Sequence, residues 1–279
     1  MSQSGIKSMP VWKWALLLVV NMVLATIMYA FSQLAFMVIE KPWVQWSVGV
    51  VISAAMIGLY ALFVRWFEKH KAKDIPFNRL AQDTAKGLGV GFCFFACVVL
   101  IMMLSGLYRI SSIGTDKPQE IVSAFSLLLA VGIGEEITFR GVLFRWIDEK
   151  MGFAAALIVS AVLFGLIHIF QESATLWSSL AIAIEAGLLL GAAYKYSGTL
   201  WLPIGIHWAW NFTQGNIFGF GVSGQDAGDS LFKSTVNGPD LLTGGSFGAE
   251  ASVIPVVLGL LLSAWYIWKI TSRNAVSPD

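Results

Sequence analysis

Gly132-Ile-Gly-Glu-Glu-Ile-Thr-Phe-Arg-Gly141 is a polar stretch within an apolar segment, about 119–148, that is long enough to cross a membrane. Two adjacent carboxylic acids are unfavourable at that depth, because a charge at the bilayer centre costs at least ~2.5–3.5 kcal/mol on insertion scales. Acidic residues in such segments normally face a bundle interior or a water-filled cavity, and they mark functional sites. Glu135 and Glu136 are therefore the first candidates for a site inside a membrane protein.

The composition of the whole chain is typical of a polytopic membrane protein. Of its 279 residues, 57% are hydrophobic and only 13% are charged, and the mean hydropathy is +0.72. A soluble domain has ~25% charged residues, so this class is excluded. The 18 basic and 17 acidic residues leave no basic surplus, so no nucleic-acid partner is expected.

Hydropathy divides the chain into about eight segments near the ~20 residues that cross ~30 Å of hydrocarbon. They cover residues 11–39, 43–67, 85–108, 119–148, 153–170, 175–196, 200–218 and 251–270. The pattern predicts an all-α polytopic membrane protein, with a single membrane domain over residues 1–279 built as a bundle of about eight transmembrane helices. For the short seventh segment, a re-entrant helix is the alternative.

A Gly- and Ser-rich loop, residues 219–250, precedes the last segment. Its composition predicts a flexible, solvated connector on the outer side, with a lid as the alternative. The orientation follows from Lys and Arg, which are enriched in cytoplasmic connections. With the N-terminus inside, 14 of the 18 basic residues fall on the cytoplasmic side, and the four outside are Lys41, Arg109, Lys117 and Lys233. We therefore expect both termini in the cytoplasm, and the protein in a bacterial or archaeal plasma membrane.

Helix geometry separates the two acids of the opening stretch. Glu136 and Arg140 are four residues apart, so they share a face and can form an ion pair. Glu135 is rotated by ~100° from Glu136, which leaves it free to face a site. Glu185, in the sixth segment, is another buried acid, either a partner for a polar group or a site member. Nearby, Gly187-x-x-x-Gly191 has the small-residue spacing that lets helices pack closely.

Two of the three histidines also lie in membrane segments, in Phe164-x-x-x-His168 and His207-x-x-x-Asn211. Glu135 lies ~20 Å and His168 ~22 Å from the cytoplasmic ends of their helices, so the two side chains can meet. A single buried histidine is usually a satisfied hydrogen-bonding residue. Two histidines, an asparagine and an acid pair on three segments favour one shared polar site.

In this order, these motifs resemble the CAAX prenyl protease and bacteriocin-processing family of membrane proteases, also called CPBP or Abi. The resemblance covers about residues 119–211. It implies an intramembrane endopeptidase that cleaves a peptide or a membrane-anchored, CAAX-like substrate near its C-terminus. The implied catalytic residues are Glu135 and His168, which would activate water, and His207 and Asn211, which would stabilise the oxyanion. Glu136, Arg140 and Phe164 would support the site.

Three alternatives remain open at this point. The first is zinc, for which Glu135, His168 and His207 would be the ligands, although the glutamate-dependent reaction without a cofactor is favoured. The second is a proton-coupled transporter, in which buried acids and histidines form a relay. The third is a non-catalytic binder, such as a bacteriocin-immunity protein. The expected partners are a peptide or lipid-anchored protein substrate and membrane lipid.

Overall fold

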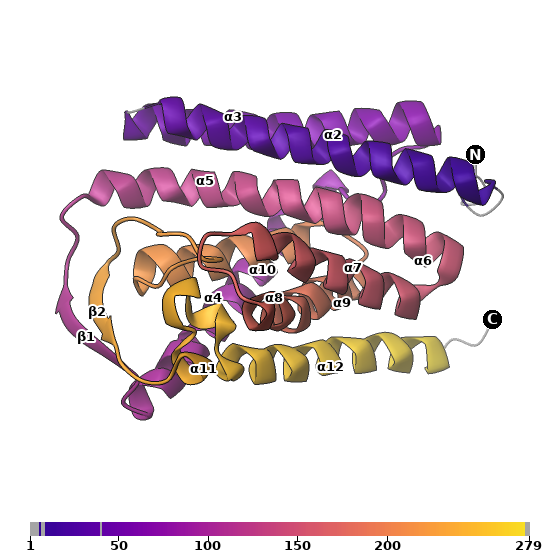
Figure 1. The fold of residues 1–279 in the computed structure, drawn as a ribbon. Helices are drawn as coiled ribbons and strands as arrows, with labels where there is room; N and C mark the ends of the chain where they lie inside the picture. Colours follow the sequence, from indigo (N-terminus) through magenta and orange to yellow (C-terminus); the bar gives the residue numbers. More distant parts are fainter. Residues whose placement is uncertain (1–5, 7–8, 40, 277–279) are drawn as a thin grey trace.

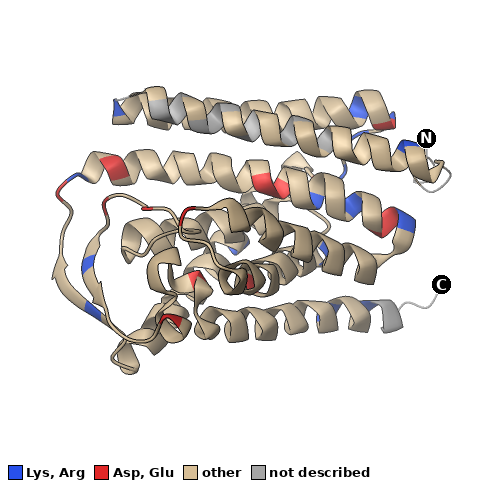
Figure 2. Cartoon of the chain, viewed as in Figure 1, with Lys and Arg blue, Asp and Glu red and all other residues tan. Residues whose placement is uncertain are grey.

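The computed structural model describes residues 6, 9–39 and 41–276, so Lys7 and Glu40 lie outside the described residues. The chain folds into a mostly helical bundle whose long helices run side by side, with both termini at the same end (Figure 1). This placement agrees with an even number of crossings. Lys and Arg gather towards the end that carries the termini (Figure 2).

The first half of the chain supplies three long helices. They are α2 (Val11–Val38), α3 (Pro42–Phe63) with its π-helical continuation η1 (Val64–Glu68), and α4 (Leu80–Leu104), which follows the short turn η2 (Phe77–Arg79). Pro42 starts α3 at a position where its missing N–H has no helical partner to lose. The helices α2 and α3 pack side by side on α5 (Pro118–Glu136).

The second half carries the motifs. Here α5 continues into the π-helix η3 (Ile137–Phe144) and α6 (Arg145–Met151), and α7 (Phe153–Ile167) ends in the turn η4 (His168–Phe170). The sixth segment is α8 (Leu176–Ile182), η5 (Ala183–Gly187) and α9 (Leu188–Ser197). The last helices are α10 (Trp201–Phe212) with η6 (Thr213–Ile217), and α12 (Val253–Val276).

Six helical segments within the described residues are long and apolar enough to cross a membrane, which makes the chain a multi-pass membrane protein. They begin at Pro42, Phe77, Pro118, Phe153, Leu176 and Val253. The other two of the eight expected segments are α2, whose side chains are described only in part, and α10 with η6. The latter spans only ~25 Å, which agrees with the expectation of a short seventh segment.

The prediction of an all-α fold is wrong in one respect. Tyr108, expected at the end of the third membrane segment, begins the strand β1 (Tyr108–Ile113), which pairs antiparallel with β2 (Phe232–Val236). The second strand lies in the Gly-rich loop, which also contains the short helices α11 (Asp240–Thr243), η7 (Gly245–Phe247) and η8 (Ala249–Ala251).

The expectation of a flexible connector at 219–250 is therefore also wrong. The glycines of this loop serve tight backbone turns instead. Gly244 has a φ of 89°, and a Cβ there would lie 1.8 Å from the carbonyl oxygen of Gly248. Gly248 itself has a φ of 116°, and a Cβ would lie 2.2 Å from the carbonyl oxygen of Gly221. Only glycine permits these conformations and approaches, so the loop is a folded cap.

Close helix contacts position the site-bearing helix α10. It crosses α4 where Gly87 faces Gly205 and Gly91 faces Ile206. A Cβ at Gly91 would lie 2.3 Å from the carbonyl oxygen of Ile206, so the two backbones touch there. The predicted close packing at Gly187 is confirmed, since a Cβ there would lie 2.8 Å from Cα of Ala161 in α7.

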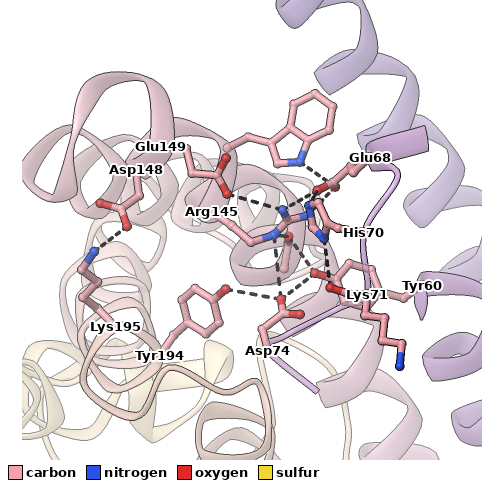
Figure 3. A network of polar contacts seen from close by, with 12 residues as sticks. Tyr60, Glu68, His70, Lys71, Asp74, Arg145, Asp148, Glu149, Tyr194 and Lys195 are labelled. Atoms are coloured by element: carbon pink, nitrogen blue, oxygen red, sulfur yellow. Dashed lines mark hydrogen bonds and ion pairs between the residues drawn. The ribbon is translucent and has the colours of Figure 1, made fainter. Parts of the chain in front are cut away.

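A polar network closes the end of the bundle that carries the termini (Figure 3). Arg145 donates two hydrogen bonds to Glu68, at 2.6 and 2.5 Å, and Tyr60 donates one of 2.6 Å to Asp74. Arg145 also donates to the carbonyl oxygen of Gly141 at 2.8 Å, and the Tyr60 hydroxyl oxygen lies 3.0 Å from the same carbonyl oxygen. The network fixes η3, the helix that follows the two acids, from its inner end.

Candidate functional site

Glu136 is the centre of the buried polar site. Its Oε1 accepts hydrogen bonds from Arg140 Nη1 at 2.8 Å and from His207 Nδ1 at 2.9 Å. Glu136 and Arg140 are both 0% exposed, so the predicted i,i+4 pair forms away from water. Arg140 Nη2 also reaches the carbonyl oxygens of Ala186 and Gly187, at 3.4 and 3.3 Å. The hydrogen bonds of this one ion pair therefore connect the fourth, sixth and seventh segments.

The helix widens into a π-helix directly after the two acids. This conformation runs over η3, from Ile137 to Phe144; it is rare in proteins and is frequently found at functional sites. It begins one residue after Glu136, and Thr138 Oγ1 donates a hydrogen bond of 2.8 Å back to the carbonyl of Gly134. The wider turn and this bond define the backbone from which Glu135, Glu136 and Arg140 project.

His168 is held by its own helix at one ring nitrogen. Its Nδ1 lies 2.7 Å from the carbonyl oxygen of Phe164. A carbonyl can only accept, so Nδ1 carries the proton, and in the neutral ring Nε2 is the acceptor. The Phe164 ring lies 4.5 Å from the guanidinium carbon of Arg140 and 4.9 Å from the His168 ring. Phe164 thus packs between the ion pair and the histidine.

His207 lies between the two acids of the opening stretch. Its Nδ1 faces Glu136, and its Nε2 lies 3.8 Å from Oε2 of Glu135. Since an ionised Glu136 that already accepts from Arg140 can only accept, Nδ1 of His207 donates to it. The 3.8 Å separation is too long for a hydrogen bond, and both side chains line a cavity.

The predicted catalytic residues line one cavity. Glu135, His168, His207 and Asn211 all contribute to a cavity of about 130 Å³. Apolar side chains of α5 and several polar side chains of the folded loop contribute to its lining. Further lining residues are Leu127, Leu128 and Val131 from α5, and Ser223, Gln225 and Asp226 from the loop. Four of the seven predicted site residues thus share one cavity, and the other three, Glu136, Arg140 and Phe164, contact His207 or His168 beside it.

The zinc alternative does not fit this arrangement. Among the described residues, no group of three or more His, Cys, Asp or Glu side chains is placed to hold a metal ion. His207 uses Nδ1 for Glu136 and His168 uses Nδ1 for the backbone, so each ring keeps Nε2 free.

Sequence reasoning missed Glu250, which the folded loop brings to the site. Its Oε1 accepts from the backbone N–H and Oγ of Ser223, at 3.0 and 2.8 Å, and its Oε2 accepts from Nε2 of Gln214. Burial raises the pKa of Glu250 from 4.5 to about 7, against the opposing effect of these donors. No residue spacing identifies Glu250; the available signal was the set of glycines around it, which indicates a tightly folded segment.

Glu250 and Glu185 line a second, smaller cavity. It measures about 20 Å³ and shares His168, His207 and Asn211 with the larger one. Glu185 is therefore a member of the site region.

Comparison with known proteins gives one family. Residues 117–213 match the family described as type II CAAX prenyl endopeptidase, Rce1-like. The matched segment contains all seven of the predicted site residues. No curated protein and no solved structure matches the chain.

Proposed function

Residues 117–213 of this chain form a domain of the Rce1-like type II CAAX prenyl endopeptidase family, a family of proteases, and we propose that the chain hydrolyses a peptide bond at the Glu135 cavity. The observation that carries the proposal is the shared cavity of Glu135, His168, His207 and Asn211. It combines a free carboxylate, an imidazole acceptor and an amide donor at one point. These are the groups that proton transfer and oxyanion stabilisation require.

In the first step, a water beside Glu135 becomes the nucleophile. The carboxylate of Glu135 accepts a proton from this water, and Nε2 of His168 is the second acceptor within the cavity. The oxygen then attacks the carbonyl carbon of the substrate. When the tetrahedral intermediate collapses, the C–N bond breaks, and the proton held by the enzyme passes to the leaving amine.

In the same step, His207 and Asn211 stabilise the oxyanion. Asn211 supplies its amide N–H, and His207 supplies Nε2–H. Because Nδ1–H of His207 is bound to Glu136 at 2.9 Å, donation from Nε2 requires the doubly protonated ring. The carboxylates of Glu136 and Glu135 on either side are suited to that charge. One oxyanion donor is worth ~2.7–4 kcal/mol of transition-state stabilisation in other proteases.

The substrate that fits this cavity is a peptide or a protein anchored in the same membrane, cleaved near its C-terminus. Leu127, Leu128 and Val131 provide apolar lining, and Ser223, Gln225 and Asp226 of the loop provide polar lining. With both termini in the cytoplasm, as the basic residues predict, these loop residues lie on the outer side.

The test compares the wild type with Glu135→Gln in proteoliposomes, using a quenched-fluorescent isoprenylated CAAX peptide and mass spectrometry of membrane peptides from the host. We expect turnover to fall at least ~10²-fold with the thermal midpoint unchanged, because only the proton acceptor is lost. Glu120→Gln, at a partly exposed acid on the same helix that pairs with Lys117, is the matched control. Turnover retained in Glu135→Gln would refute the proposal.

A further inference from the structure

The small inner cavity lies directly beside the proposed catalytic residues. His168, His207, Asn211 and Ser223 line both cavities. Its volume of about 20 Å³ is enough for one water-sized group, because a cavity needs ~10–15 Å³ to hold a water. A substrate group bound in the larger cavity, which we call the outer cavity, is therefore close to the inner one.

Glu185 presents an unpaired carboxyl group to this inner cavity. Its side chain is 0% exposed, and neither of its oxygens has a hydrogen-bond partner among the described residues. Glu136, the other fully buried acid of the site, has Arg140 and His207 as partners. Buried carboxyl groups without a partner are rare in folded proteins, because removal from water is costly unless it is compensated.

The backbone holds Glu185 in this position. A Cβ at Gly259 of α12 would lie 2.8 Å from Cα of Glu185, so the two helices touch at that residue. The carboxyl group therefore cannot leave the cavity by a small shift of η5. Because the position of Glu185 is fixed, a hydrogen-bond or ion-pair partner for its carboxyl group would have to be a bound group inside the cavity.

The walls of the inner cavity select the kind of partner. Phe164, Ile182 and Leu190 form an apolar lining, and Glu250 adds a second carboxyl group on the side of the folded loop. Neither cavity has Lys or Arg among its described lining residues. A cavity that combines apolar lining with two carboxyl groups fits the end of an alkyl chain that carries a positive charge. An ammonium has the size of a water molecule, whereas a guanidinium is larger.

We propose that the inner cavity is a specificity subsite that takes the ammonium group of a lysine side chain of the peptide substrate, with Glu185 as its counter-ion. This inference rests on the proposed function. Glu185 binds substrate in this scheme and takes no part in proton transfer. The subsite selects lysine over uncharged residues by charge, and over arginine by size.

The first experiment measures specificity. A set of quenched-fluorescent peptides carries one lysine at each position around the cleavage site, and matched sets carry norleucine or arginine. We expect kcat/KM for the best lysine peptide to exceed that of its norleucine analogue by about 10- to 100-fold, the range of one charge-assisted hydrogen bond. In Glu185→Gln this ratio should approach 1, and in Glu120→Gln it should stay at the wild-type value. Equal cleavage of the lysine and norleucine peptides by the wild type would overturn the proposal.

The second experiment does not depend on catalysis or on a folded variant. Dicyclohexylcarbodiimide, which modifies carboxyl groups in apolar surroundings, is applied to the wild type, and modified Glu185 is quantified by peptide mass spectrometry. We expect n-butylammonium to slow this modification at least fivefold relative to n-butanol or sodium ions. Equal modification under all conditions would overturn the subsite. Protection of Glu185 in a protein that cleaves no peptide would instead refute the proposed protease function and leave the cation site standing.

Discussion

Replacing Gly91 with alanine should impair the proposed active site without altering any residue that lines it. A Cβ at position 91 would lie 2.3 Å from the carbonyl oxygen of Ile206, where an ordinary contact is at least 3.4 Å. The backbones of α4 and α10 must therefore separate by about 1.1 Å. His207 follows Ile206 directly on α10 and moves with it. A misplacement of ~1 Å costs ~10²-fold in rate, and overpacking of this kind costs ~1–3 kcal/mol in stability.

The chain offers a matched control two residues earlier on the same helix. A Cβ at Gly89 would have no atom within 4 Å, so Gly89→Ala adds a methyl group to open space. That variant should gain ~0.5–1 kcal/mol, because alanine is the better helix former. Initial rates on the isoprenylated peptide and thermal midpoints in detergent are compared for the two variants. Equal rates in Gly91→Ala and Gly89→Ala would refute the idea that this contact sets the position of His207.

Three further predictions concern the charged groups. Arg140→Met should lower the free energy of unfolding by ~3–5 kcal/mol, because it leaves Glu136 buried without its cation. Scanning fluorimetry compares its thermal midpoint with that of Arg65→Met, a control at an exposed arginine. Equal midpoints in the two variants would contradict the prediction. Because the folded-state pKa of Glu250 is raised from 4.5 to about 7, its contribution to stability is full below pH 4.5 and is lost as the pH rises through 7. That loss amounts to ~3 kcal/mol. We expect the difference in thermal midpoint between the wild type and Glu250→Gln to change by a corresponding amount between pH 4 and pH 8. A difference that stays constant over this pH range would contradict the prediction. Exhaustive chelation should leave peptide cleavage intact, because the described residues contain no group placed to hold a metal ion. Activity that is lost on chelation and restored by zinc would show that the reaction depends on a metal.

Local helical spacing was sufficient to predict the buried ion pair and the contact of Phe164 with His168. Glu136 and Arg140 are four residues apart on one helix, as are Phe164 and His168, so neighbouring turns bring each pair together. The membrane segments were predictable for a similar reason, since hydropathy alone defines where a chain can cross lipid.

Contacts between distant parts of the chain were not predictable in this way. The strand that begins at Tyr108 pairs with Val236, and no local pattern indicates such a partner. Glu250 reaches the site only because Gly244 and Gly248 adopt positive φ values and let the loop fold closely. The glycine content of the loop was interpreted as flexibility, although the same residues are needed for tight turns. A single sequence does not separate these two uses of glycine.

Oε1 of Glu136 accepts hydrogen bonds from Arg140 and His207, which the ribosome adds to the chain at different times. Glu135 and Glu136 enter the membrane first, His207 is added later on α10, and Glu250 emerges only with the last loop. A half-made chain therefore lacks the imidazole that Glu136 holds and the carboxyl group that supports the loop. The proposed active site is therefore complete only after the loop that carries Glu250 has been made.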